Sequence, residues 1–207
     1  MRIRKATYED IPVLMQLFER AKSIMRASGN MHQWGCGYPS EEIVRRDIDA
    51  GVCYVVCDNN AVVATMAFIP GPDPTYSVIE DGAWLNDEPY YVIHRIAVAV
   101  PGKGCARRLL DWAFERTGTV RIDTHRDNVI MHHILHDYGF EYCGVIHLAN
   151  GDPRDAYQMS TDNREQSTDE SLCQASESQV YLSFYSERSQ GSSPRSGVKD
   201  DRGKFTN

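Results

Sequence analysis

The sequence predicts one domain of mixed helices and strands, followed by a polar tail. Helical and strand-like hydrophobic patterns alternate in the order βααβββαβαβ, with a final edge strand over Arg154–Met159. Near Thr161 the composition shifts to Ser, Gln, Asp, Glu, Arg and Gly without sustained periodicity, which is typical of a segment that cannot bury a core. We therefore expect a folded domain over residues 1–160 and a disordered tail over residues 161–207.

The first half of the domain predicts two helices and a hairpin. Apolar residues at Ile11, Leu14, Met15 and Phe18 keep to one helical face. Ser40 is a good N-cap, and an Asp-Asn-Asn turn separates two apolar runs. The predicted elements are a strand over Arg2–Lys5, a helix over Ile11–Met25, a helix between Ser40 and Gly51, and strands over Val52–Cys57 and Ala61–Ile69.

A long link over Pro70–Pro89 separates this half from the second half, and a loop of that length is expected to be functional or disordered. The second half alternates strands and helices. The predicted elements are strands over Tyr90–Val100, Thr119–Asp123 and Gly139–Ile146, and helices over Ala106–Phe114 and Asn128–Asp137.

The central feature is the tight turn Pro101–Cys105, which joins the long strand directly to a helix. Gly102 and Gly104 permit positive φ and close approach of a ligand, while the first N–H groups of a helix lack partners and attract anions. Lys103, Arg107 and Arg108 add positive charge. The turn therefore predicts a phosphate site, although an ordinary strand-to-helix turn with solvated basic residues has the same pattern.

Two familiar phosphate motifs are excluded at this turn. A P-loop requires Gly-Lys followed by Ser or Thr, and a dinucleotide fingerprint requires a third glycine. Gly104 is instead followed by Cys105, Ala106 and Arg107. Neither ATP nor NAD is indicated.

The residues of this turn resemble the acetyl-CoA signature of the GNAT N-acetyltransferase superfamily. That signature is a strand ending in an apolar residue, any residue and Val, followed by Arg or Gln, two residues, Gly, one residue, and Gly or Ala. Here the positions are Ile96-Ala97-Val98 and Pro101-Gly102-Lys103-Gly104-Cys105-Ala106. Pro101 departs from the family pattern, because it removes a side-chain donor and a backbone N–H.

A second GNAT motif follows downstream. Asn128, Met131, Ile134, Gly139 and Phe140 fall in register with it, so the resemblance covers about residues 1–160. It implies a GNAT α+β fold, with a central mixed, mostly antiparallel sheet flanked by helices. It also implies an acetyl-CoA-dependent N-acetyltransferase.

The resemblance further implies a set of site residues. The backbone N–H of Ile96 would polarise the thioester carbonyl, and Val98 would pair with the pantetheine arm. The residues implied in cofactor binding are Ile96, Val98, Gly102, Lys103, Gly104, Cys105, Ala106, Arg107 and Asn128. Many members use a Tyr as general acid where this chain has Leu135, and the helical position of Tyr138 does not support a transfer of that role.

His94 is the candidate general base. A protonated primary amine cannot attack a thioester, so a group must take its proton, and imidazole titrates near neutral pH. His94 lies on the central strand just before the turn, and arylalkylamine acetyltransferases, which the chain resembles, place a histidine there. Packing or hydrogen bonding within the sheet is the alternative role.

Acceptor recognition is assigned to the loop between the first two helices and to the acidic link. Trp34 and Tyr38 would form an aromatic wall, and Asp81, Asp87 or Glu88 would attract a cationic amine. Core packing and solvated surface are the alternatives. His132 and His136 have i, i+4 spacing, but we expect no metal site.

Composition narrows the class of protein. The net charge of −7 argues against a nucleic-acid binder, and the six cysteines contain no Cys-x-x-Cys pair that would indicate zinc. The charged segment Met1–Ala6 does not resemble a signal peptide, and no apolar run approaches membrane-spanning length, so we expect a cytoplasmic protein. The expected partner is a small-molecule amine, and a homodimer is left open. The alternatives are a non-catalytic acyl-CoA binding module and a protein N-terminal or lysine acetyltransferase.

Overall fold

A computed structural model describes residues 1–35 and 37–161, so residues 162–207 of the tail predicted over 161–207 lie outside the described residues. The helices are α1 (Ile11–Ala27), α2 (Glu41–Asp49), α3 (Cys105–Phe114) and α4 (Val129–Tyr138), with short 3-10 helices η1 (Tyr8–Asp10) and η2 (Pro74–Tyr76). The strands are β1 (Arg2–Lys5), β2 (Cys53–Asp58), β3 (Ala61–Pro70), β4 (Tyr91–Val98), β5 (Thr119–Thr124), β6 (Glu141–His147) and β7 (Pro153–Ser160). Each predicted element is present, with boundaries that differ by a few residues.

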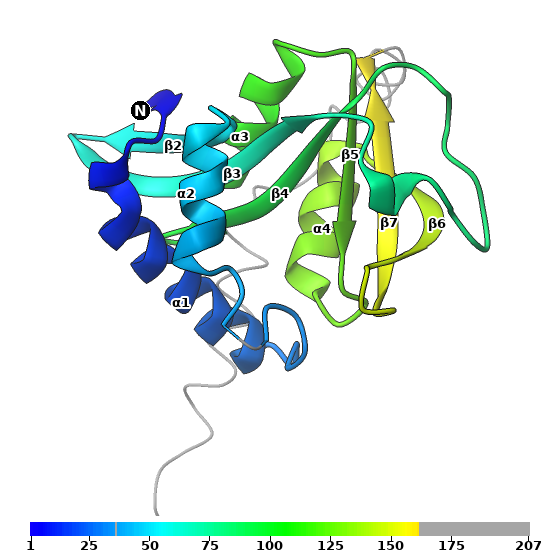
Figure 1. The fold of residues 1–207 in the computed structure, drawn as a ribbon, viewed down its shortest axis with the longest axis horizontal. Coiled ribbons are helices and arrows are strands. Elements are labelled where there is room, and N and C mark those ends of the chain that lie inside the picture. The colour runs from blue at the N-terminus through cyan, green and yellow to red at the C-terminus, as the bar shows by residue number, and fades with distance from the viewer. Residues whose placement is uncertain (36, 162–207) are drawn as a thin grey trace, which may run out of the picture. The chain divides into compact units, whose positions relative to one another are not determined.

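The seven strands form one mixed sheet in the order β1-β2-β3-β4-β5-β7-β6 (Figure 1). Every neighbouring pair is antiparallel except β4 and β5, which run parallel. In the sequence, helix α3 connects these two strands. The prediction of a mixed, mostly antiparallel sheet is confirmed. The prediction of Arg154–Met159 as an edge strand is wrong, because β7 lies between β5 and β6 and its Ala156 is fully buried.

Helices cover the two faces of the sheet in different ways. Alternate residues of β2 point to opposite faces, with Val55 packed under α1 and α2 and Val56 packed under α3. Helices α3 and α4 share the second face with the largest apolar cluster, which includes Leu109, Leu110 and Leu135. Over β5–β7 the first face carries no α-helix within the described residues; there the link after β3, with its short helix η2, lies on Val92 and Ala156 and completes the core with Tyr76.

Strand β4 carries a bulge in its second half. Ala67 pairs with His94 while Thr65 pairs with Ala97, so β4 has one more residue than β3 in this interval. Arg95 takes up the extra length with a φ of 53°. On the other side, the pairing of β4 with β5 is limited to Tyr91 with Val120 and Val92 with Arg121. Beyond these pairs the two parallel strands separate.

The link between β3 and β4 is anchored at several points. The Arg121 guanidinium lies between two rings of the link, 4.1 Å from the centre of Trp84 and 3.9 Å from that of Tyr90. It also donates to the Asn86 carbonyl at 2.8 Å. Glu80 forms a β-bridge with Val145 of β6. The link is thus a packed part of the domain and, within the described residues, not a disordered segment.

Candidate active site

The turn that joins β4 to α3 has the geometry of an anion site. Gly102 and Gly104 have φ values of 76° and 67°, and Gly104 is the N-cap residue of α3. No side chain caps α3, whereas Ser40 caps α2 and Asn128 caps α4. A Cβ at Gly104 would meet no atom within 4 Å, so space is open at this helix start. The turn therefore fits the diphosphate of a nucleotide-like cofactor.

The side chains around the turn differ in their positions. Lys103 and Arg107 are exposed, and the Arg107 guanidinium lies 5.4 Å from the ring centre of Tyr138. Arg108 instead donates to the carbonyl of Met1 at 2.8 Å. Cys105 is buried, and burial raises the pKa of its thiol. Of these side chains, Lys103 and Arg107 are the ones available to a bound anion.

Ile96 and Val98 lie on the part of β4 that follows its last pair with β5. Both side chains pack on the core cluster beneath α3. Their backbones thus belong to the strand section where β4 and β5 separate, which is where an extended cofactor arm would find free peptide groups.

The side chain of Asn128 is engaged within the protein. Its oxygen accepts from the N–H of Met131 at 3.2 Å, and its amide donates to Gln33 at 2.9 Å. Gln33 also accepts from Asn30 at 2.8 Å. Asn128 therefore joins the start of α4 to the loop between α1 and α2.

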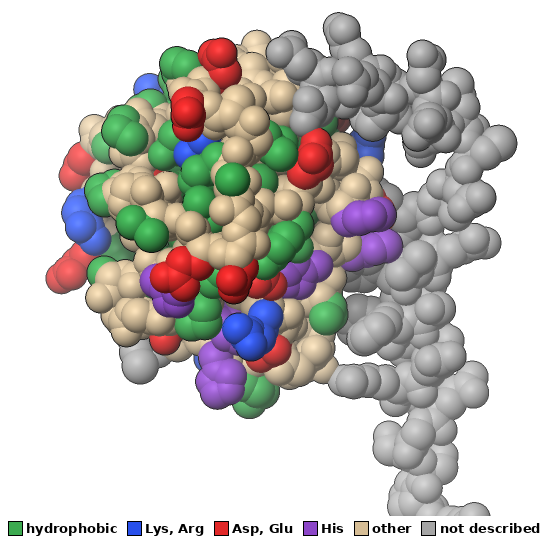
Figure 2. All heavy atoms as spheres, turned by 90° about the vertical axis from the view of Figure 1, so that its right-hand side faces the viewer, with side chains coloured by type: hydrophobic (Ala, Val, Ile, Leu, Met, Phe, Trp, Pro, Cys, Tyr) green, Lys and Arg blue, Asp and Glu red, His purple; other side chains and the backbone are tan. Residues whose placement is uncertain are grey.

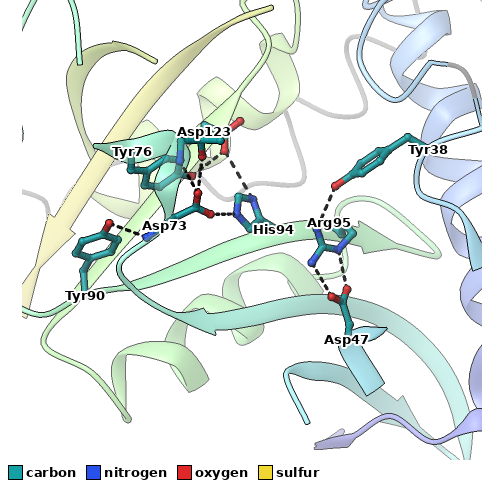
Figure 3. Close-up of polar contacts among 9 residues, drawn as sticks. Tyr38, Asp47, Asp73, Tyr76, Tyr90, His94, Arg95 and Asp123 are labelled. Atoms are coloured by element: carbon teal, nitrogen blue, oxygen red, sulfur yellow. Dashed lines mark hydrogen bonds and ion pairs between the residues drawn. The ribbon is translucent and has the colours of Figure 1, made fainter. Parts of the chain in front are cut away.

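His94 is held by a carboxylate that comes from the link. Its Nε2 lies 3.0 Å from Oδ2 of Asp73, the N-cap residue of η2 (Figure 3). The other oxygen of Asp73 accepts from both the N–H and the hydroxyl of Thr75. The hydrogen bond from His94 holds the pKa of Asp73 well below its usual range, and the bonds from Thr75 act in the same direction.

A second carboxylate approaches His94 from β5. Oδ1 of Asp123 lies 3.7 Å from Nδ1 of His94, and it accepts the hydroxyl of Tyr76 at 2.7 Å. Tyr76 is 2% exposed, and burial raises the pKa of its hydroxyl well above the ordinary value. Tyr76 therefore keeps its proton and acts as a donor to Asp123.

Sequence reasoning identified His94 but missed Asp73, Tyr76 and Asp123. Asp73 and Tyr76 are in the link, and Asp123 is near the end of β5, so two separate segments meet at the imidazole carried by β4. The available signals were weak: Asp73 stands between two prolines, and Asp123 follows the apolar residue Ile122 in a strand that also contains Arg121.

Arg95, next to His94, extends away from Asp73 and joins the bulge to α2 and its preceding loop (Figure 3). Its Nε and one terminal nitrogen donate to the two oxygens of Asp47 at 2.8 and 3.0 Å. The other terminal nitrogen donates to the Tyr38 hydroxyl at 3.0 Å. The Trp34 ring packs edge-on against Phe18 and lies 6.4 Å from that of Tyr38. Trp34 and Tyr38 thus form a contiguous aromatic pair.

The acidic residues predicted for acceptor binding lie apart from this group. Asp81, Asp87 and Glu88 are exposed on the link, and among the described residues none of them forms an ion pair with His94. Their role in acceptor binding stays a prediction.

Side chains that could give a proton to the leaving thiolate are buried or half-buried, and they include Cys143 and Tyr90. Leu135 is in the core, and the Tyr138 hydroxyl donates to Asp111 of α3 at 2.8 Å. Burial raises the pKa of Cys143. The Tyr90 hydroxyl accepts from the backbone N–H of Asp73 at 3.1 Å.

Figure 2 shows several histidine and acidic side chains on one face of the molecule. His133 lies 3.0 Å from Asp137, and His147 lies 4.0 Å from Glu80. Within the described part of the chain, no three potential ligands converge to hold a metal ion.

Comparisons with known proteins agree with this fold. The model of the acetyltransferase (GNAT) family matches residues 14–140, more than half of the chain. This protein therefore belongs to the GNAT family of acetyltransferases. Among curated proteins, none matches the chain.

Several solved structures of acetyltransferases are similar to this chain. A GNAT-family acetyltransferase from Streptococcus agalactiae 2603 is 34% identical, with a TM-score of 0.72 over 77% of this chain and 95% of that one. A GNAT-family acetyltransferase from Listeria monocytogenes 4b F2365 is 20% identical, with a TM-score of 0.58 over 77% and 94%. The ribosomal-protein-alanine N-acetyltransferase of Brucella melitensis is 17% identical, with a TM-score of 0.54 over 77% and 99%. The last two share the fold.

In residues 1–35 and 37–161, none of the helices has the length and apolar character needed to cross a bilayer.

Proposed function

We propose that this acetyltransferase transfers the acetyl group of acetyl-CoA to the primary amine of a small molecule, by direct attack in a ternary complex. The observation that carries the proposal is the position of His94. It lies on β4 two residues after the last strand pair with β5, between two carboxylates and on the strand that leads to the uncapped start of α3.

The residues of the turn suit the cofactor. The first-turn N–H groups of α3 would bind the diphosphate, with Gly102 and Gly104 allowing close approach and Lys103 and Arg107 adding charge. The backbones of Ile96 and Val98 would bind the thioester and the pantetheine arm. Cys105 and Ala106 contribute their backbone to this helix start. Acetyl-CoA supplies an acyl group that is already activated.

The protein must then provide a free amine and a site for the developing negative charge. His94 would accept the proton of the acceptor ammonium, because its ring is half-buried and fixed by Asp73. The N–H of Ile96 would stabilise the oxyanion. No tyrosine acid is needed where Leu135 stands, because a thiol with a pKa near about 8.5 is a tolerable leaving group.

Calorimetry and kinetics test the two parts of this proposal. Titration with acetyl-CoA should give saturable heat, and the absence of heat would remove the cofactor assignment. Replacing His94 with Gln should lower kcat/KM by about 10²- to 10⁴-fold near neutral pH. The defect should shrink as the pH rises, because more of the amine is then already deprotonated; a defect that stays constant with pH would exclude His94 as the base.

Two other functions remain as alternatives. Pro101 and Leu135 favour a non-catalytic acyl-CoA binding module, because both depart from the enzyme pattern. The fold shared with a ribosomal-protein-alanine N-acetyltransferase favours a protein acceptor. Incubation with acetyl-CoA and mixtures of amines and peptides, followed by mass spectrometry, separates all three, because only an enzyme releases free CoA and the acetylated species reveals the acceptor.

The proposed enzyme would act in the cytoplasm. A homodimer is testable by light scattering of the purified chain, where a mass of twice 23.5 kDa would support it.

A further inference from the structure

The two ring nitrogens of His94 face different carboxylates. Nε2 is within hydrogen-bond distance of Asp73, at 3.0 Å, whereas Nδ1 is 3.7 Å from Asp123, beyond that distance. The side chains of the histidine and of the two acids are 21%, 19% and 11% exposed, respectively, so water reaches them only in part. The two sides of the imidazole are therefore not equivalent.

Asp73 determines which nitrogen carries the hydrogen. An ionised carboxylate can only accept hydrogen bonds, and Asp73 is held in this form by its donors. Nε2 must then be the donor. A neutral imidazole has one N–H, so the lone pair of His94 is on Nδ1 and points toward the side of Asp123.

This arrangement leaves two acceptors facing each other. The lone pair of Nδ1 and the carboxylate of Asp123 lie 3.7 Å apart, and Tyr76 satisfies only one of the oxygens of Asp123. The charged groups around the imidazole are Asp73 from the link, Asp123 from β5 and, acting through space, Asp47 from α2, whose charge is paired with that of Arg95. Tyr76 from η2 is neutral. Within the described residues, neither Asp73 nor Asp123 forms an ion pair with a Lys or Arg, so a donor of several hydrogens would satisfy both Nδ1 and Asp123.

The location of the gap matches the reaction. His94 and Asp123 each follow, by two residues, the last pair of β4 with β5, which is Val92 with Arg121. Both side chains lie on the sheet face that carries Tyr76. A ligand that contacts both is thus at the point where the two strands begin to separate.

We propose that Asp123 binds the ammonium group of the acceptor beside Nδ1 of His94. Asp73 is the positioning residue that keeps Nδ1 free of hydrogen. The acceptors are therefore alkylamines, which are cationic at neutral pH, rather than weakly basic arylamines. This inference rests on the proposed function. The ammonium gives one proton to Nδ1, and its nitrogen attacks the thioester carbon. The C–N bond forms, the C–S bond breaks, and the second proton leaves with the thiolate as CoA thiol. The imidazolium then releases its proton to solvent.

Kinetics with two acceptor probes test the role of Asp123. Phenethylamine is cationic at neutral pH and aniline is not. Asp123→Asn should raise the KM for phenethylamine about ten- to a hundredfold, the loss of a charged hydrogen bond, and change that for aniline little. Asp152→Asn, an exposed acid in the β6–β7 turn, is the control. Equal effects on both probes, faster acetylation of aniline by the unmodified enzyme, or a larger effect of Asp87→Asn or Glu88→Gln would overturn the assignment.

Nuclear magnetic resonance tests the same inference without catalysis. In the full-length protein, the ¹⁵N shifts of neutral His94 should show a hydrogen on Nε2, and Asp73→Asn should weaken this preference. Phenethylammonium should perturb Nδ1 in the unmodified protein and not in Asp123→Asn. A hydrogen on Nδ1, or no response to the ammonium, contradicts the inference even where the variants fold poorly. If no amine is acetylated at all, the proposed function fails, while the shifts still decide whether this is an ammonium site.

Discussion

Arg95 and Asp47 form a two-point ion pair that fastens the bulge of β4 to helix α2. The guanidinium donates to both carboxylate oxygens, at 2.8 and 3.0 Å, and the two side chains are 10% and 13% exposed. Burial raises the pKa of Asp47 although Arg95 opposes the shift. The pair therefore fixes the residue beside His94 at some desolvation cost.

Removing one member of this pair should destabilise the protein. Asp47→Ala leaves the Arg95 charge buried without its main partner, and we expect the free energy of unfolding to fall by about 3 kcal/mol in urea denaturation. The exposed pair of Glu41 and Arg45 on the same helix is a matched control, and Glu41→Ala should cost about 0.5 kcal/mol or less. Equal losses would show that the burial of the first pair has no energetic weight.

Acid should weaken the contact between Arg4 and Asp10. The hydrogen bonds from Arg4, at 2.6 and 2.9 Å, lower the pKa of Asp10 below its ordinary value. A lowered carboxyl pKa stabilises the fold at pH values above the unfolded pKa of about 3.9, and this contribution disappears as the pH falls through the folded value. Asp10→Asn should therefore be less stable than the unmodified protein at pH 7, with the difference narrowing below pH about 4. A difference that grows in acid would contradict this assignment.

Substitution of Gly104 should lower both the stability of the protein and its affinity for acetyl-CoA, and a control glycine separates these two effects. Gly104→Ala places a side chain at a φ of 67°, and we expect a loss of about 1 to 2 kcal/mol in stability. Gly29→Ala, at a φ of 96° and with equally open space, should cost a similar amount. Only Gly104→Ala should weaken acetyl-CoA binding in calorimetry, by about tenfold or more. Unchanged affinity would argue against a diphosphate at this turn.

The stacked guanidinium of Arg121 should control the order of the link. Arg121→Lys keeps the charge but loses the planar contact with Trp84 and Tyr90, which is worth about 2 kcal/mol when desolvated. Hydrogen exchange of the amides in residues 84–90 should become faster. Arg116→Lys, at the exposed stack on Trp112, should leave that segment unchanged. Unaltered exchange in Arg121→Lys would show that other contacts hold the link.

Local patterns predicted most of the fold. The turn over Pro101–Cys105, the helical face beginning at Ile11 and the Ser40 cap depend on residues close in sequence, and all three are present. The place of β7 could not be predicted in this way, because strand order depends on long-range pairing. Buried Ala156 gives no sign of lying inside a sheet, whereas an edge strand fits the same pattern.

The residues of the candidate site also differ in whether local sequence could predict them. His94 was accessible to sequence reasoning because it stands a fixed number of residues before the turn. Asp73 and Asp123 were not, since Asp73 reaches the imidazole only through the folded link and Asp123 only through the pairing of β4 with β5. The acids of the link that the sequence suggested are exposed. The link acid that contacts His94 is Asp73, which Thr75 holds at the start of η2.

The narrow junction between β4 and β5 has a thermodynamic consequence. Two antiparallel halves of the sheet, β1–β4 and β5–β7–β6, are joined in their hydrogen-bond ladder by two residue pairs. An acyl carrier that hydrogen-bonds to both strands where they have separated would add bonds between the two halves of the sheet. The melting temperature of the protein should then rise with carrier concentration, because the carrier binds the folded state. In a cell where the acyl donor is scarce, the folded enzyme would then be least stable.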